Sequence, residues 1–250
     1  MASKIVPIVL LFAMTLALTT AASATCSNAT FTGTYGITFG GIDSHGRLRA
    51  AVAQITADGK GKFTGVVSES KGGVISSDVP VTGTYAIKAS CIGSGTWLEQ
   101  AQKLRHYNLV LVSGGASMEM IQTDASHTES GFAQAQGKAT CTTAAVHGTF
   151  GFHATGSYVG VGPAAVIGQL ILDGSGNIAG QESGSVNGTI FSGVLILGGY
   201  TINSDCTGTA KLNPAGQSAI NLNLVVVDGG SKVLAVETDT GSIVSGSIEK

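Results

Sequence analysis

The chain has 250 residues, of which only 11% are charged and 37 are glycine, and its net charge is −2 at pH 7. This mixture is too apolar for a disordered protein and too rich in glycine for a helical bundle, so it favours strands joined by tight turns. The slight negative charge offers no electrostatic attraction to nucleic acid or to an anionic membrane, and we exclude both as partners.

The first 24 residues have the pattern of a secretory signal peptide. Lys4 supplies the basic start, residues 5–18 an apolar run, and Ala22-Ser23-Ala24 a cleavage site of small residues. We therefore expect a secreted or periplasmic protein that begins at Thr25. Thr25 is not the small residue that normally precedes a lipidated cysteine, and no later stretch reaches the roughly 18 uninterrupted apolar residues of a membrane span.

From Cys26 to the last residue, the chain consists of two copies of one sequence, in which residue i matches residue i+115 without a gap. Each half is large enough to bury a core of its own, so we expect two domains, residues 25–135 and 139–250, with a cleavable polar segment at 134–138 between them. The matched positions are mainly turn residues, aromatics and cysteines: Asp58-Gly59 with Asp173-Gly174, Tyr85 with Tyr200, Gly114-Gly115 with Gly229-Gly230, and Thr123-Asp124 with Thr238-Asp239.

The four cysteines repeat with the same spacing in both copies. If each copy folds alike, only the pairing within copies is possible, which joins Cys26 to Cys91 and Cys141 to Cys206. Each bridge would close a loop of roughly 65 residues and stabilise its domain by about 4 kcal/mol. No cysteine has a second metal ligand two to four residues away, so a zinc site is not expected.

Strand-forming segments alternate with glycine-centred turns along both copies. Asp58-Gly59 and Asp173-Gly174 have the signature of tight hairpin turns. Eight or nine short strands fit each copy, and no segment after the signal has helical periodicity. In the first copy the expected strands are residues 33–40, 48–57, 62–70, 74–81, 83–89, 95–100, 105–112, 117–123 and 129–135.

A run of consecutive antiparallel strands has to bury one face and protect two edges. Closing the sheet into an up-and-down barrel achieves both, so the fold class we expect is all-β, with two tandem antiparallel barrels of about eight strands each. A pair of β-sandwiches uses similar strands and turns and stays open as the alternative, because the sequence does not show which strands pair across the closure.

Each copy opens with Gly-Thr-aromatic-Gly, at residues 33–36 and 148–151, and later carries Gly-x-Tyr followed by Cys-x-Gly. In these motifs the chain resembles a family of exported bacterial tandem-repeat β proteins whose function is uncharacterised. It more distantly resembles calycin-like barrels of the lipocalin, avidin and allene oxide cyclase types. The Gly-x-Trp usual at the opening of lipocalins and avidins is absent, so the resemblance assigns no binding or catalytic residue.

Few residues suggest a catalytic or metal-binding site. Residues 173–177 resemble half of a calcium loop, but the twelfth position is Gly184 and the first copy has lysines in place of ligands. The five histidines share no spacing between copies and read as surface residues, and no Gly-x-Ser-x-Gly nucleophile motif is present. The repeated Thr123-Asp124 and Thr238-Asp239 are interpreted as turn caps. We expect no metal, no cofactor and no catalytic residues.

The clearest difference between the copies is chemical. The first copy has nine basic residues against three, and it holds the only tryptophan, Trp97, which matches Leu212. Large aromatics, flexible methionines and nearby cations are typical of a site for an amphipathic ligand, whereas smaller aliphatics are expected to fill the second interior. We therefore predict a ligand site in the first copy, formed by Trp97, Tyr107, Arg105, Arg47, Met118 and Met120.

These features favour an exported, non-enzymatic protein that binds a small apolar ligand or an extracellular protein or glycan. Two alternatives from other classes stay open. One is an isomerase- or cyclase-type enzyme that uses the barrel interior to shape a reactive ligand. The other is a purely structural component of the envelope or surface.

Overall fold

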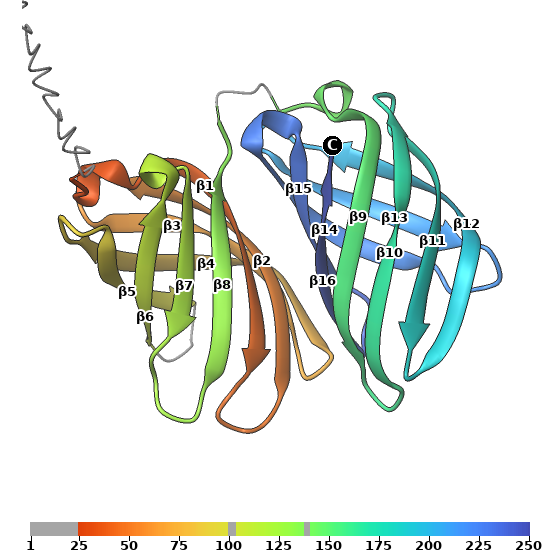
Figure 1. Ribbon diagram of the computed structural model, residues 1–250, viewed down its shortest axis with the longest axis horizontal. Coiled ribbons are helices and arrows are strands. Elements are labelled where there is room, and N and C mark those ends of the chain that lie inside the picture. The colour runs from red at the N-terminus through yellow and green to blue at the C-terminus, as the bar shows by residue number, and fades with distance from the viewer. Residues whose placement is uncertain (1–24, 100–103, 138–140) are drawn as a thin grey trace, which may run out of the picture.

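The computed structural model describes residues 25–99, 104–137 and 141–250; the predicted signal peptide and Lys103 and Lys138 lie outside these ranges. The described chain forms two closed antiparallel barrels side by side (Figure 1), which confirms the barrel and rejects the sandwich. No helix in these ranges has the length and apolarity to cross a membrane. The first barrel consists of β1 (Thr32–Ile42), β2 (Leu48–Asp58), β3 (Lys62–Lys71), β4 (Val74–Ile87), β5 (Ile92–Glu99), β6 (Arg105–Val112), β7 (Ser117–Gln122) and β8 (Thr128–Ala135).

The second barrel repeats this order. Each strand pairs with its neighbours in the sequence, and the last strand pairs with the first. Its strands are β9 (His147–Tyr158), β10 (Gly162–Asp173), β11 (Asn177–Val186), β12 (Thr189–Ile202), β13 (Thr207–Pro214), β14 (Ile220–Val227), β15 (Lys232–Glu237) and β16 (Ser242–Glu249). Short 3₁₀ turns, η1 (Asn28–Thr30), η2 (Ser113–Gly115), η3 (Thr143–Ala145) and η4 (Asp228–Gly230), stand between strands or before each barrel.

One expected strand break is wrong. The segments 74–81 and 83–89 form a single 14-residue strand, β4. Gly83 does not mark a turn there: it pairs with Phe63 of β3, and a Cβ at Gly83 would collide with the Phe63 ring. The glycine therefore lets an aromatic ring lie across the backbone of the neighbouring strand, which is a strand role of glycine rather than a turn role.

The disulfides close the same end of each barrel. Cys26 is bonded to Cys91 and Cys141 to Cys206, each pair with a Cα–Cα distance of 4.9 Å, which confirms the predicted pairing. At this end the Tyr85 hydroxyl donates to the carbonyl of Phe31 at 2.8 Å, so the segment before β1 is tied across the opening. Two disulfides are consistent with an extracellular or periplasmic protein.

The opposite end of each barrel has no such plug in the described residues. It is formed by the hairpins that follow β1, β3 and β7, and by their counterparts after β9, β11 and β15. We call it the hairpin end. Strand alternation brings the inward side chains at the ends of β3 and β5 and the starts of β2, β6 and β8 together there.

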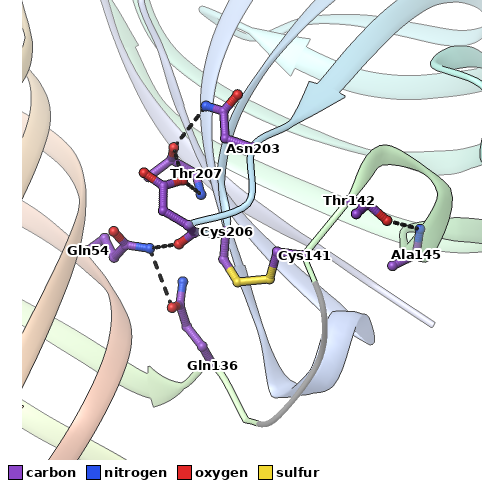
Figure 2. The surroundings of a disulfide bond; sticks show 9 residues. Gln54, Gln136, Cys141, Thr142, Ala145, Asn203, Cys206 and Thr207 are labelled. Carbon is purple, nitrogen blue, oxygen red and sulfur yellow. Dashed lines mark hydrogen bonds between the residues drawn. A yellow bond between two sulfur atoms is a disulfide. The ribbon is translucent and has the colours of Figure 1, made fainter.

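The barrels meet through their outer faces. Ala50 and Val52 of β2 pack with Val225, Val227, Leu234, Val236 and Ile243 of β14, β15 and β16, and all seven side chains are buried. Polar bonds surround this apolar contact. Figure 2 shows one: the Gln54 amide donates to the carbonyl of Asp205, beside the Cys141–Cys206 disulfide. That each half folds alone stays a prediction.

Candidate functional site

The interior of the first barrel is filled by aromatic side chains. The Trp97 ring meets the Phe39 ring edge to face, with centroids 5.0 Å apart, and Phe63 lies 5.4 Å from it on another side. Trp97 is only 2% exposed. The space left among Trp97, Tyr107 and their neighbours is about 20 Å³, which is close to the volume of a single water molecule.

A network of charges lies at the hairpin end of the first barrel, inside it. Its centre is Arg49, whose guanidinium is fully buried and contacts three carboxylates: Glu69 at 2.5 Å, Glu99 at 2.8 Å and Glu129 at 2.9 Å. Arg105 also donates to both oxygens of Glu99, at 2.8 and 3.1 Å. The three carboxylates come from three strands, so the network ties the barrel together across its interior.

The network also holds its aromatic neighbours. The Trp97 indole N–H donates to Glu99 at 3.0 Å, and the Arg49 guanidinium lies 5.5 Å above the Phe39 ring. Burial opposes ionisation of Glu69, but the Arg49 charge and its hydrogen bond win and lower the pKa of Glu69. Burial likewise disfavours the charged form of Arg49, yet the surrounding carboxylates raise its pKa. Because these buried charges are paired with one another, they fill this end of the barrel interior and do not form an accessible ligand site.

The structure brings five of the six predicted ligand residues together, but inside the packed core. Trp97, Tyr107, Met118 and Met120 belong to the first barrel's hydrophobic cluster. Arg105 is buried beside them instead of lying at a rim. Arg47 is separate: its side chain is half exposed and pairs with Asp43 at 2.7 Å in the β1–β2 hairpin. A ligand site in the first barrel stays a prediction.

The interior of the second barrel is open where the first is filled. A cavity of about 90 Å³ lies at its hairpin end, lined by apolar side chains such as Phe152, Leu170, Leu212 and Leu222. A second space of about 40 Å³ shares Leu170, Leu212 and Leu222 and extends toward the disulfide end. The expectation that small aliphatic residues fill this interior is therefore wrong.

The two interiors differ because large residues were exchanged for small ones at matched positions. Offset by 115, Ala154 replaces Phe39, Leu212 replaces Trp97, Leu222 replaces Tyr107 and Ala235 replaces Met120. A few exchanges go the other way, such as Phe152 for Ile37 and Ile248 for Ala133, but they do not restore the lost volume. The charge network is absent from the second barrel, where its five members become Ala164, Gly184, Pro214, Ile220 and Val244.

Two carboxyl groups line this cavity, at positions that do not match the glutamates of the first barrel's charge network. Glu182 on β11 and Glu237 on β15 are 5% and 6% exposed. The Tyr158 hydroxyl, at the end of β9, donates to Glu237 at 3.2 Å. Burial raises the pKa of both carboxyl groups, and burial together with the Glu237 charge raises the pKa of Tyr158. The cavity thus combines apolar walls with two buried carboxyl groups at its mouth, and no arginine or lysine contacts Glu182 or Glu237 among the described residues.

Sequence reasoning missed these groups, although a signal for them exists. Glu182 shares its strand face with the buried Ile178, and Glu237 shares its face with the buried Val233. A carboxylate on the core face of an alternating strand is unusual and marks a position of interest. The same signal applies to Arg49, which alternates with the buried Ala51 and Ala53 on β2.

The aspartates of the two Thr-Asp motifs cap a neighbouring strand instead of their own turn: Asp124 accepts the backbone N–H of His106 at 2.8 Å, and Asp239 that of Asn221 at 2.7 Å. Asp173 accepts the N–H groups of Ser175 and Asn177, as expected of a hairpin turn. Four of the histidines are exposed, but His127 is not a surface residue: it is half-buried, 3.7 Å from Glu129.

No model of a known protein family matches the chain, and no curated protein matches it. Among solved structures, kievitone hydratase from Nectria haematococca is similar with a TM-score of 0.26 and 8% identity, over 92% of this chain and 94% of that chain. The Myxococcus xanthus hemagglutinin, solved in complex with a mannopentaose, is similar with a TM-score of 0.18 and 12% identity, over 87% of this chain and 99% of that chain. These similarities are too weak to support an inference about function.

Proposed function

We propose that this protein binds the apolar part of a small amphipathic molecule in its second barrel. The supporting observation is the cavity that replaces the packed aromatic core of the first barrel. Two barrels with one backbone plan show that the fold can be filled completely, so an unfilled interior in one of them is a property of its sequence. An unfilled cavity costs stability, and a function in ligand binding would explain why the cavity is present.

The walls and the mouth define the chemistry of the ligand. Leu170, Leu212 and Leu222 suit a short alkyl chain or one small ring, because the cavity of about 90 Å³ is below the volume of a drug-sized site. At the mouth, Glu182 and Glu237 accept a hydrogen bond when ionised and donate one when protonated. An amine or an alcohol fits these groups, whereas a carboxylate on the ligand would meet two groups of its own sign.

Isothermal titration calorimetry with straight-chain amines, alcohols and carboxylates of four to ten carbons tests this proposal. We expect amines and alcohols to bind, carboxylates to bind least, and affinity to rise with chain length until the cavity is full. Leu212→Trp restores the residue of the first barrel and should abolish binding. The matched control is Leu197→Trp, on the outer face of β12, which should bind like the wild type. If neither amine nor alcohol binds, the proposal is wrong.

A second candidate function rests on the raised pKa of Glu237 beside Tyr158. Burial raises the pKa of this carboxyl group, and a carboxylic acid hydrogen-bonded at the mouth of an apolar cavity can act as a general acid, as an isomerase or cyclase requires. Native mass spectrometry of the protein purified from its source distinguishes the two functions. A retained, unaltered small molecule supports binding, and conversion of that molecule by fresh protein, lost in Glu237→Gln, supports the enzyme.

A further inference from the structure

The contact between the two barrels joins two different faces. The first barrel contributes the outer face of β2 and β3, with Ala50, Val52, Gln54 and Ser68, which we call the β2 face. The second barrel contributes the outer face of β14 and β15, with Asn223, Val225, Val227, Leu234 and Val236, which we call the β14 face. Because the chain is a gapless duplication, each barrel carries a version of both faces, and the internal contact uses one from each.

The two unused faces are exposed and keep apolar residues. The second barrel's copy of the β2 face, here the β10 face, has Ala165 and Ile167 at the positions of Ala50 and Val52, and Ile167 is 64% exposed. The first barrel's copy of the β14 face, here the β6 face, has Val110, Val112 and Ile121 at the positions of Val225, Val227 and Val236. These three side chains are 43%, 39% and 53% exposed.

Polar partners of the internal contact are retained as well. The Asn223 amide donates to the Ser68 hydroxyl at 2.8 Å across the joint. The matched residues are Asn108 on the β6 face and Ser183 on the β10 face, so both halves of this hydrogen bond persist. Gln54, which bonds to a backbone carbonyl of the second barrel (Figure 2), is matched by Gln169, which is exposed on β10.

A glycine of the second barrel independently indicates that another barrel covers the β10 face. Gly36 lies under Val227 and Val225 of the second barrel, and a Cβ there would collide with both side chains, so the internal contact requires glycine. The matched Gly151 is also glycine, although within the chain a Cβ there would meet only the Glu249 carbonyl, at 4.0 Å. Glycine in a strand interior is destabilising, and its retention at Gly151 fits a face that another barrel covers.

From these matches we propose that copies of this protein associate head to tail, with the β10 face of one molecule packed on the β6 face of the next. In Figure 1 the strands of the β6 face and of the β10 face are not among those that form the internal joint, so one contact does not block the other. A contact between two different faces is heterologous and extends into a filament or closes into a ring.

The new contact has a polar residue at two positions where the internal contact has a buried apolar one. Glu119 stands where Leu234 is buried, and Thr128 stands where Ile243 is buried. A carboxylate at the centre of the β6 face weakens the contact, because its burial without a partner is costly. The association is therefore reversible and weaker than the internal joint, and Glu119→Leu should tighten it about tenfold or more.

Sedimentation velocity over a wide range of protein concentration tests the proposal. The wild type should show a mass that rises with concentration, and Glu119→Leu should show the same rise at lower concentration. Ile167→Asp breaks the β10 face and Ile121→Asp breaks the β6 face, so each should be monomeric. Leu197→Asp, on an exposed outer position whose counterpart Thr82 lies outside the internal contact, is the control and should behave like the wild type. Circular dichroism confirms that each variant is folded.

Mixing the two broken variants decides whether the contact is head to tail. Ile167→Asp keeps an intact β6 face and Ile121→Asp keeps an intact β10 face, so together they should form dimers and nothing larger. A mixture that stays monomeric overturns the proposal, as does a wild type and Glu119→Leu that are both monomeric at every concentration. Association that survives both single substitutions would also overturn it, since the interface would then lie elsewhere.

Discussion

The hairpin ends of the two barrels have opposite contents on the same backbone plan. In the first barrel Arg49 holds Glu69, Glu99 and Glu129 in a closed network of ion pairs beneath packed aromatic rings. In the second barrel an apolar cavity contains two carboxyl groups without a cationic partner among the described residues. The backbone fold therefore does not determine whether a barrel interior is packed or contains a cavity. The inward-facing side chains determine it.

The difference also shows how a duplicated protein can divide its tasks. A barrel filled with rings and ion pairs leaves little space for a ligand, but its outer face packs against the second barrel. A barrel with an unfilled interior is less stable, and it benefits from a partner that buries its outer strands. Under the proposed function, stability and binding are assigned to different copies.

The largest expected effect tests whether the network holds the first barrel together. Arg49→Met leaves three buried carboxylates without their central cation and should lower the free energy of unfolding by about 3–5 kcal/mol, measured by urea denaturation. Lys62→Met, at an exposed position of the same barrel, is the control and should change stability by at most about 0.5 kcal/mol. A small loss in Arg49→Met would show that the carboxylates are stable without the ion pairs.

A second substitution makes the first interior resemble the second. Trp97→Leu removes the ring between Phe39 and Phe63 together with the hydrogen bond to Glu99, and should cost about 3 kcal/mol. It should also open a cavity in the first barrel, detectable as binding of xenon or benzene by NMR. If stability is unchanged, the tight packing of the first interior is not what separates the two barrels.

Much of this fold follows from the sequence for identifiable reasons. The gapless offset fixes the disulfide pairing, because only one pairing treats both copies alike, and the hairpin turns at Asp58 and Asp173 fix antiparallel neighbours. Closure into barrels follows from the need to protect the edge strands. The continuity of β4 does not follow from the sequence, because glycine serves both turns and close strand contacts, and only the position of Phe63 distinguishes these roles.

The candidate ligand site was harder to predict than the fold. A difference in side-chain volume between the copies does not reveal whether a barrel interior is packed or contains a cavity. Trp97 indicated a binding residue, yet an aromatic ring occupies a pocket as readily as it lines one. Leu212 and Ala235 indicated a filled interior, yet neighbouring residues such as Leu222 are not large enough to compensate. The balance depends on three-dimensional packing across strands, to which the sequence pattern gives no direct access.

The dependence of stability on pH should have opposite signs in the two barrels. The lowered pKa of Glu69 stabilises the fold above its ordinary value of 4.5, and this contribution is lost as the pH falls. The raised pKa of Glu237 has the reverse effect: above its ordinary value of 4.5 the unfolded chain releases the proton that the folded barrel retains, so stability falls as the pH rises.

Thermal melting between pH 4 and pH 8 checks these signs. Compared with the wild type, Glu237→Gln should lose less stability as the pH rises, and Glu69→Gln should lose less as the pH falls. Glu249→Gln, at an exposed carboxylate paired with Lys232, is the control and should follow the wild-type curve closely. Parallel curves for all three variants would contradict the opposite pKa shifts of Glu69 and Glu237.

The smallest expected effect is in the fluorescence of Trp97, and it distinguishes the two candidate sites. Trp97 is the only tryptophan and lies buried in the first barrel, so its emission should be blue-shifted. Adding decylamine or decanol to saturation should leave that emission unchanged if the ligand enters the second barrel, because no wall of that cavity belongs to the first barrel. A shift or quenching that persists in Leu212→Trp, corrected for the added tryptophan, and disappears in Trp97→Leu would instead place the ligand in the first barrel. The barrels would then have exchanged the roles assigned to them here.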